Sequence, residues 1–273
     1  MGEIMIKKMK DSQFELLISD ACGAISGWKF WLYLAWMDVK GQYRRSFVGP
    51  VWLTLNAAIF ISAFSFLGAR IFKSPIGDYI IPFACGQILF VFLSTTLNES
   101  AYAFINSAAY VKQLPVPRLS FVLRVVAKNA IIFMHTLPVL LGIIILWGSV
   151  YQILFFNLLL GVIGVFVLLS IFCAVVSLVA ARFRDVPMIV SNVVNLCYFA
   201  TPIIWPAEML KGGERFLLYL NPFYLMIEVI ISPLLGRPAG EDVWFCFLMM
   251  LLTILVVGIP LAVKYRRSIP YWV

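Results

Sequence analysis

Long apolar stretches separated by short charged segments dominate the pattern of the chain. A helix that crosses a membrane needs about 20 apolar residues. A charged side chain at the centre of such a helix costs about 2.5–3.5 kcal/mol, so charges are expected to mark the ends of the spans. On this basis, the charge-free intervals predict single spans at 46–69, 79–98, 186–207 and 243–263.

The longest charge-free interval, 129–181, is long enough for two spans, and the turn-like sequence WGSVYQ at 147–152 divides it. We therefore expect a helical hairpin there. Together with the four single spans, the hairpin predicts an all-α integral membrane protein with six transmembrane helices.

Two shorter apolar segments lie between the predicted fifth and sixth spans. The segments 216–227 and 229–236 are too short to cross a bilayer, and Pro222 and Pro233 interrupt them. Irregular backbone is tolerated at membrane depth only where protein or a water-filled cavity covers it. Short re-entrant or interfacial helices are expected here.

Composition supports a membrane protein without a separate soluble domain. The 273 residues are 63% hydrophobic and 12% charged, whereas soluble domains are about 45–50% apolar and about 25% charged. The chain is expected to form one transmembrane domain, 1–273. Its expected parts are a cytoplasmic N-terminus at 1–49, a six-span core at 50–263 and a cytoplasmic tail at 264–273.

Basic residues predict the orientation of the chain. The net charge of +8 could suggest nucleic acid, but Lys and Arg lie at the ends of apolar segments, so no nucleic-acid partner is expected. These residues are concentrated in the segments that share a side with both chain ends, which predicts cytoplasmic termini. The first 20 residues lack a continuous apolar core, so no cleaved signal peptide is expected.

The segment 28–46 combines tryptophan with basic residues at helical spacing. Trp28, Trp31 and Trp36 recur among other apolar residues, and basic side chains such as Lys40 lie between them. This pattern favours an amphipathic helix in the inner membrane interface. The alternative is a basic flank of the first span whose long side chains reach the lipid headgroups.

The sequence contains no recognisable catalytic or metal-binding motif. It has no GxxxxGK[ST] nucleotide loop. The single histidine, His135, has no second histidine or carboxylate nearby in sequence, and the five cysteines show no CxxC spacing. Catalytic, metal-binding and cofactor-binding residues are therefore expected to be absent from this chain. His135 is expected either to hydrogen-bond a neighbouring helix or to contact a transported substrate.

Uncharged polar residues share one face in two of the predicted spans. In the fifth span, Ser191, Asn195 and Tyr198 recur at spacings of 4 and 3. In the first span, the small residues on one face are Thr54, Ala58, Ser62, Ser65 and Ala69. A small-residue face suits close helix packing, whereas hydroxyls, amides and aromatic rings suit the hydroxyl edges and C–H faces of sugars. Both interpretations are open for the first span.

Two predicted cytoplasmic turns are also informative. The loop 106–126 places Lys112 and Arg118 around a Leu-Pro-Val-Pro break. The sequence ARFRDVP at 181–187 forms a tight turn, with Pro187 in the first turn of the next helix. Each turn is either a solvated segment that sets the topology or a surface that receives a push from a soluble motor.

Five of these stretches together resemble the permease subunits of type-2 ATP-binding-cassette exporters. Within that family, they are most similar to the branch that exports bacterial surface polysaccharides, namely O antigen, capsule and wall teichoic acid. The resemblance runs from about residue 30 to the C-terminus. The matching motifs are GQYRRSFVGPVWL (41–53), VKQLPVPRLS (111–120), ARFRDVPMIV (181–190), ATPIIWPAEML (200–210) and YLNPFYLMIEVI (219–230).

The resemblance implies a homodimer around a central conduit in the bacterial inner membrane, with two copies of a separate ATPase that holds ATP and Mg. The helix before the first span and the two cytoplasmic turns would dock on that ATPase. The docking residues it implies are Arg44, Arg45, Tyr110, Lys112, Arg118, Arg182, Arg184 and Asp185. Asp185 would pair with a basic group or cap the fifth helix.

By the same resemblance, the first and fifth spans would line the conduit, and 207–242 would form short periplasmic gate helices. The implied glycan contacts are Asn56, Phe60, Phe64, Asn195, Tyr198 and Phe199.

The function implied is ATP-driven export of a polysaccharide on a polyprenyl diphosphate carrier, with O antigen preferred. The chain itself would be a transport subunit and not an enzyme. The alternatives are a drug or antibiotic efflux permease of the same fold and a membrane-embedded transferase for lipid-linked sugars. A transferase would need clustered acids or a metal site, for which the sequence offers little.

Overall fold

The computed structural model describes residues 2–44, 49, 51–147, 153–210 and 212–273. Within these ranges, the secondary structure is helical and contains no strand, as predicted. Five helices in the described part of the chain are long and apolar enough to cross a membrane, which indicates a multi-pass membrane protein. They are α3 (Val51–Ile71), α4 (Ile76–Ser100), α7 (Leu119–Trp147), α8 (Phe155–Arg182) and α12 (Glu241–Tyr265).

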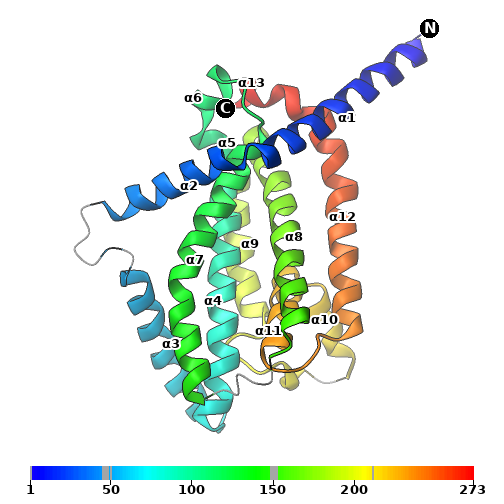
Figure 1. Cartoon of the computed structure of the whole chain (residues 1–273). Helices are drawn as coiled ribbons and strands as arrows, with labels where there is room; N and C mark the ends of the chain where they lie inside the picture. Colours follow the sequence, from blue (N-terminus) through cyan, green and yellow to red (C-terminus); the bar gives the residue numbers. More distant parts are fainter. Residues whose placement is uncertain (1, 45–48, 50, 148–152, 211) are drawn as a thin grey trace.

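The helix α4 forms the centre of the bundle (Figure 1). Apolar residues are distributed around most of its circumference, a pattern typical of a buried helix. In its most apolar 18-residue stretch, 72% of the residues are buried, against 17% in α3 and 11% in the segment containing α12. It packs against α3, α7, α8 and α11 (Pro222–Leu234). The outer helices therefore present most of their apolar surface outward, as lipid-facing helices do.

Two helices precede the first span, α1 (Gly2–Ser26) and α2 (Trp28–Tyr43). The helix predicted at 28–46 corresponds to α2, which ends earlier, at Tyr43. Ala35 and Val39 on α2 are buried, and this helix packs against α7, whereas Trp28 and Trp36 are exposed. One apolar side is thus used for packing on the bundle, and the position of the exposed tryptophans in a membrane interface stays a prediction.

The predicted hairpin is confirmed, because α7 ends at Trp147 and α8 begins at Phe155. The fifth span is shorter than predicted. The helix α9 covers only Val186–Ala200, and Thr201 adopts an extended conformation. Thr201 precedes Pro202, and a residue before proline is driven out of the α-helical region by the proline ring. The sequence pattern missed this stop because the apolar residues continue beyond it.

The segment between α9 and α12 also breaks at a different place from the one predicted. The helical segment Gly213–Tyr219, which includes α10 (Phe216–Tyr219), meets α11 at a bend of 92°. Pro222 begins α11, where its missing N–H costs nothing, and Pro233 lies inside α11 without ending it. The Asn221 side chain accepts hydrogen bonds from the N–H groups of Phe223 and Tyr224 and so caps α11.

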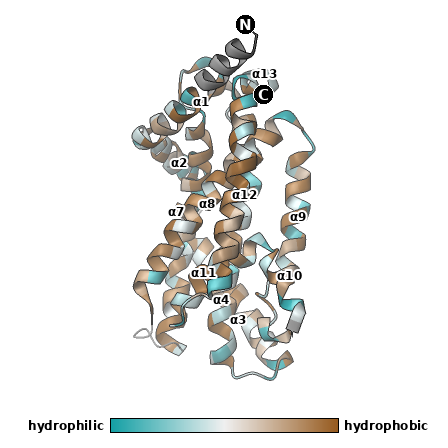
Figure 2. Cartoon of the chain, turned by 90° about the vertical axis from the view of Figure 1, so that its right-hand side faces the viewer, coloured by the Kyte–Doolittle hydropathy of each residue, from teal (hydrophilic) through white to brown (hydrophobic). Residues whose placement is uncertain are grey.

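The remaining helical segments are short. They are α5 (Ala103–Asn106), α6 (Ala108–Gln113), η2 (Ala207–Met209), η3 (Gly212–Arg215), η4 (Arg266–Ser268) and α13 (Ile269–Trp272). The helices α1, α6 and α13 lie at one end of the bundle, which we call the terminal end, and α10 lies toward the other end (Figure 1). Hydrophobic residues follow the long helices between the two ends (Figure 2).

Candidate functional site

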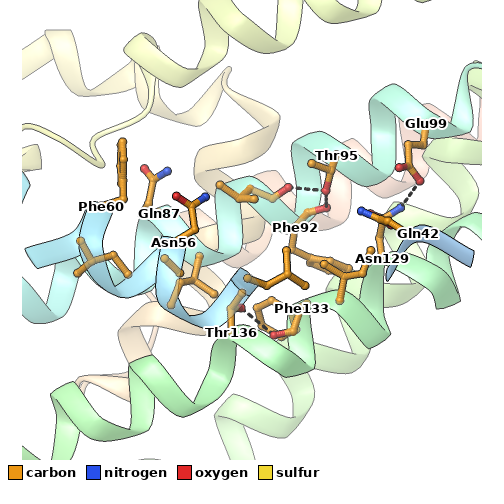
Figure 3. Close-up of a pocket in the computed structure, with 16 residues that line it drawn as sticks. Gln42, Asn56, Phe60, Gln87, Phe92, Thr95, Glu99, Asn129, Phe133 and Thr136 are labelled. Atoms are coloured by element: carbon orange, nitrogen blue, oxygen red, sulfur yellow. Dashed lines mark hydrogen bonds between the residues drawn. The ribbon is translucent and has the colours of Figure 1, made fainter. Parts of the chain in front are cut away.

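A cavity of about 330 Å³ lies between α3, α4 and α7, next to the end of α2 (Figure 3). We call it the polar cavity. Its polar lining residues are Gln42, Asn56, Gln87, Thr95, Glu99, Asn129 and Thr136. Its aromatic lining residues are Phe60, Phe92 and Phe133. Cavities of 300–1,000 Å³ with a few polar groups among apolar walls are the usual form of small-molecule sites.

Helical periodicity brings these residues together. On α4, Gln87, Thr95 and Glu99 are separated by 8 and 4 residues and share one face. Asn56 and Phe60 are one turn apart on α3. The polar lining residues of α7 are likewise two helical turns apart. Each of the three helices therefore turns at least one polar residue toward the same space.

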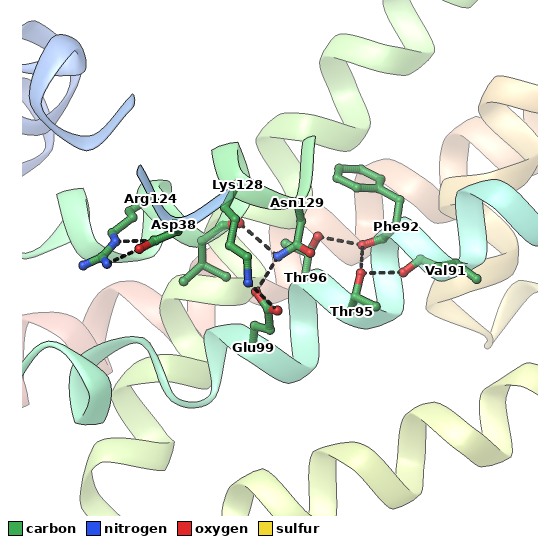
Figure 4. A network of polar contacts seen from close by, with 10 residues as sticks. Asp38, Val91, Phe92, Thr95, Thr96, Glu99, Arg124, Lys128 and Asn129 are labelled. Carbon is green, nitrogen blue, oxygen red and sulfur yellow. Dashed lines mark hydrogen bonds and ion pairs between the residues drawn. The ribbon is translucent and has the colours of Figure 1, made fainter. Parts of the chain in front are cut away.

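A charged network lies at one end of the polar cavity (Figure 4). Glu99 Oε1 lies 2.8 Å from Lys128 Nζ, and Glu99 Oε2 accepts a hydrogen bond of 2.8 Å from Asn129 Nδ2. Asn129 Nδ2 also donates to the carbonyl oxygen of Val125 at 3.1 Å. The negative charge of Glu99 is therefore balanced beside the cavity, and the remaining polar lining is neutral.

The neutral polar groups retain hydrogen-bonding capacity. Gln87 Oε1 accepts a hydrogen bond of 2.8 Å from the Tyr198 hydroxyl, which leaves the Gln87 amide nitrogen as a donor. The Thr95 hydroxyl donates to carbonyl oxygens of its own helix and keeps its lone pairs. Among the described residues, the side chains of Gln42 and Asn56 make no hydrogen bond. These groups can donate to and accept from a hydroxylated ligand.

The structure divides the six residues predicted to contact glycan. Asn56 and Phe60 line the polar cavity, and Phe64 stacks on Phe60 with ring centroids 4.4 Å apart. Tyr198 reaches the cavity through its hydrogen bond to Gln87. Asn195 and Phe199 do not line the cavity and are exposed on α9, where Phe199 is 70% accessible.

Gln87 and Asn129 were not predicted as site residues. Gln87 has only apolar residues as immediate neighbours on α4, and Asn129 follows a charged residue near the start of the apolar part of α7, so neither forms part of a recurring polar face in the sequence. The available signal was the presence of an amide in a span at all, because a polar group in a bilayer needs a partner.

His135 makes different contacts from those predicted. Its ring Nδ1 lies 2.7 Å from the carbonyl oxygen of Ile131, in its own helix. Among the described residues, the imidazole makes no hydrogen bond to a neighbouring helix, and its contact with a transported substrate stays a prediction. The contact between helices at this position uses the backbone, since the Thr54 hydroxyl donates to the carbonyl oxygen of His135 at 2.5 Å. This bond assigns Thr54, on the small-residue face of α3, to helix packing.

Most residues predicted to dock on a motor subunit are exposed. They are Arg44, Tyr110, Lys112, Arg182, Arg184 and Asp185, whereas Arg45 lies outside the described residues. The Arg182 guanidinium lies over the ring of Trp272, 5.4 Å from its centroid, which joins the turn after α8 to α13. Asp185 stands at the N-cap of α9, but its side chain makes no capping hydrogen bond, so the predicted cap is wrong.

Arg118 differs from the other predicted docking residues because it is only partly exposed and bonds within the chain. Its backbone N–H donates to Asp20 Oδ1 at 3.0 Å, and its guanidinium donates to the backbone carbonyl oxygen of Arg266. Burial and the neighbouring Arg266 lower the pKa of Arg118, and Asp20 opposes this change. These partners are far from Arg118 in the sequence, so the local sequence pattern could not predict them.

A second cavity, of about 300 Å³, lies beside α11, away from the terminal end. Asp78, Glu208 and Glu228 line it together with aromatic residues from α4 and α11. Glu228 Oε1 accepts a hydrogen bond of 2.6 Å from the Ser232 hydroxyl and lies 3.6 Å from the Arg237 guanidinium. Of the three acids, Glu228 is thus partly neutralised by neighbouring groups.

The cysteines are free, and in the described part of the chain no three His, Cys, Asp or Glu residues are arranged to hold a metal ion. Cys85 and Cys173 are buried among apolar residues of the core.

No protein-family model matches the chain. Three curated relatives are similar to it over about 70% of its length. One, from Klebsiella pneumoniae, is 23% identical over 191 residues, which cover 70% of this chain and 74% of the relative. Another, from Myxococcus xanthus, is 26% identical over 202 residues, which cover 71% and 75%. Both are named O-antigen export system permease protein RfbA. The resemblance of this chain to the permease subunits of polysaccharide-exporting ATP-binding-cassette systems is thereby confirmed.

Proposed function

We propose that this chain is the membrane subunit of an ATP-driven exporter that moves a polyprenyl-diphosphate-linked polysaccharide, with O antigen the first candidate, across the bacterial inner membrane. The observation that carries this proposal is the neutral polar cavity with aromatic walls, in a chain similar to O-antigen export permeases. Amides and hydroxyls match the hydroxyl edges of sugars, and aromatic rings match their C–H faces.

The lining of the cavity favours transient contact over tight retention. A charged site would hold one ligand group strongly, because hydrogen bonds to ions are about twice as strong as neutral ones. The one acid in the cavity, Glu99, is bonded to Lys128 and Asn129. A glycan would therefore exchange weak neutral contacts as it advances.

The arrangement in the membrane follows from the same proposal. The segment after α9 completes a fifth crossing, so the chain crosses six times with both termini in the cytoplasm. The terminal end then faces the cytoplasm, and α10 and α11 form gate helices at the periplasmic face. This placement agrees with the basic residues exposed at the terminal end.

A second copy of the chain would complete the conduit. The helix α9 contacts its own bundle mainly through α4 and α8. It leaves large apolar side chains exposed, including Met188, Leu196 and Phe199. A facing copy would cover part of this surface, and α3 and α9 would line the passage, with Asn195 and Phe199 as contacts on the side away from the polar cavity.

The energy would come from a separate ATPase, present in two copies, that holds ATP and Mg. This chain makes and breaks no covalent bond in the proposed mechanism. ATP binding would close the two motor subunits and displace the docking surface at Tyr110 and Lys112, both of which are exposed. Hydrolysis would reset the surface, so that nucleotide shifts the permease between two conformations.

Gene deletion in the native host tests the function. Polymer at the cell surface and lipid-linked polymer inside the cell are measured with and without a plasmid-borne wild-type copy. Loss at the surface, accumulation inside and restoration by the plasmid are expected. Unchanged surface polymer with new sensitivity to drugs would contradict the proposal and support the efflux alternative. Loss of complete polymer in both places would instead indicate a transferase.

A further inference from the structure

The carboxylate of Asp20 joins three distant parts of the chain at the terminal end. Asp20 is only 8% exposed. Its Oδ1 accepts hydrogen bonds from the N–H of Arg118 at 3.0 Å and from Arg266 Nη2 at 2.9 Å, and its Oδ2 accepts from the N–H of Leu119 at 3.3 Å. An acid on α1 thereby binds the start of α7 and the end of α12.

The hydrogen bonds to Asp20 fix a loop that has few backbone hydrogen bonds of its own. The loop 114–118, Leu-Pro-Val-Pro-Arg, contains Pro115 and Pro117, which have no N–H to donate. The first N–H groups of a helix also lack partners within that helix. Asp20 supplies an acceptor to the last N–H of the loop and the first of α7, at the positive end of the helix dipole.

Close packing reinforces this contact. A Cβ atom built at Gly23 would lie 3.0 Å from Cγ and 3.8 Å from Cβ of Pro117. A larger residue at position 23 would crowd Pro117, and the contact would have to relax by a few tenths of an ångström. The glycine therefore allows the backbone of α1 to approach the second proline of the loop.

The helix α2 continues the N-terminal region and is bound to α7 farther along that helix. The Trp31 indole donates to the carbonyl oxygen of Ala24 at 2.8 Å, which sets the corner between α1 and α2. Asp38 on α2 forms two hydrogen bonds of 2.6 Å with the Arg124 guanidinium on α7 (Figure 4). Two acids, one from each N-terminal helix, thus bind α7 within its first turns.

We propose that Asp20 is a positioning residue that keeps α1, the loop 114–118 and the end of α12 together as one unit throughout the transport cycle. This inference rests on the proposed export function. A push received at Tyr110 and Lys112 is then passed to α7 and α12, because the loop between α6 and α7 cannot bend away from α1. Separating α1 from the loop would leave the Asp20 carboxylate without its partners in a largely buried position, which is unfavourable.

A disulfide between α1 and the loop tests whether the unit stays closed. Gly23→Cys and Pro117→Cys are combined with Cys22→Ser, since Cys22 is exposed next to the new thiol. The expected separation of the Cβ atoms, 3.8 Å, is the usual value in a disulfide. The full permease and its ATPase partner are reconstituted in vesicles containing lipid-linked polymer, and transport is measured after oxidation and after reduction.

Equal transport in the crosslinked and reduced states is expected. Transport that stops on crosslinking and returns on reduction would overturn the proposal, because the loop would then have to leave α1. Each single-cysteine variant serves as the control for the substitution itself. If wild-type vesicles fail to transport polymer at all, the proposed function fails, and this result is distinct from a failure of the crosslinked variant alone.

A second measurement separates positioning from folding. Asp20→Asn keeps the shape of the side chain but removes the charge that Arg266 requires. Export per molecule is expected to fall several-fold, while the amount in the membrane, the bound ATPase and ATP hydrolysis stay near wild type, and Asp20→Glu restores part of the export. Glu15→Gln, an exposed acid on the same helix, is the matched control. Export that falls only in proportion to the amount of protein would overturn the proposal.

Discussion

The polar cavity and the terminal end use polar side chains in opposite ways. At the terminal end, Asp20 and Asp38 each have fixed partners, at distances of 2.6–3.3 Å. In the polar cavity, the side chains of Asn56 and Gln42 make no hydrogen bond with the described part of the chain, and Gln87 uses only its oxygen. Partnered acids hold helices in place, whereas spare amides are available to a passing ligand.

This difference teaches how one small bundle can combine rigidity with weak binding. Charged groups satisfied by the protein resist movement, because breaking such a pair leaves a charge without its partner. Neutral groups exposed in a cavity can exchange partners at small cost, because a net hydrogen bond contributes only about 0.5–1.5 kcal/mol. Substitutions at the two regions should therefore affect stability and transport in opposite proportions.

Asp38→Ala should have the largest effect on stability. It removes the carboxylate that accepts two hydrogen bonds from the Arg124 guanidinium, and the Arg124 side chain is only 21% exposed. Hydrogen bonds to charged groups contribute about 1.5–3 kcal/mol, so the free energy of unfolding should fall by about that amount. Thermal unfolding of the purified protein in detergent measures the change. Asp78→Ala, at the start of α4, is a control that makes no ion pair within the described residues, and equal melting temperatures for the two variants would show that the pair contributes nothing.

Tyr198→Phe should have an intermediate effect. It removes the hydrogen bond to Gln87 but keeps the ring, which packs 5.0 Å from Phe90 between ring centroids. Hydrogen bonds between helices in membranes average about 0.6 kcal/mol. A small loss of stability is expected, with altered export, because Gln87 gains a free acceptor in the polar cavity. Thermal unfolding and surface polymer are compared with Tyr219→Phe, and indistinguishable export in the two variants would separate Gln87 from transport.

Asn56→Leu should change stability least and transport most. Asn56 is exposed and has no hydrogen bond partner in the described chain, so a change within about 0.5 kcal/mol is expected. Loss of its amide from the polar cavity should lower surface polymer several-fold at unchanged protein level. Asn157→Leu, in the first turn of α8 and outside the polar cavity, is the matched control. Wild-type export in Asn56→Leu would assign this cavity to packing alone.

The sequence predicted the long helices well, because hydrophobicity over some 20 residues is a local property. It was less successful where one residue decides the outcome. The helix α9 ends at Ala200 because Thr201 precedes a proline, although the apolar pattern continues. The sequence also indicated the polar character of Asn56 and Tyr198, but not that Gln87 lies beside them. The rotation of α4 relative to α3 and α9 follows from packing among all three helices.

The sequence by itself determined that the chain is an apolar helical protein with charged segments between its spans, because these properties depend on neighbouring residues. Tertiary structure decided which polar groups form hydrogen bonds within the chain and which remain available to a ligand. Asp20 finds its partners 98 and 246 residues away, at Arg118 and Arg266. Asn56 makes no hydrogen bond with the described residues because its side chain borders the open space between α3, α4 and α7. Both outcomes depend on distances between segments far apart in the chain, which no local pattern contains.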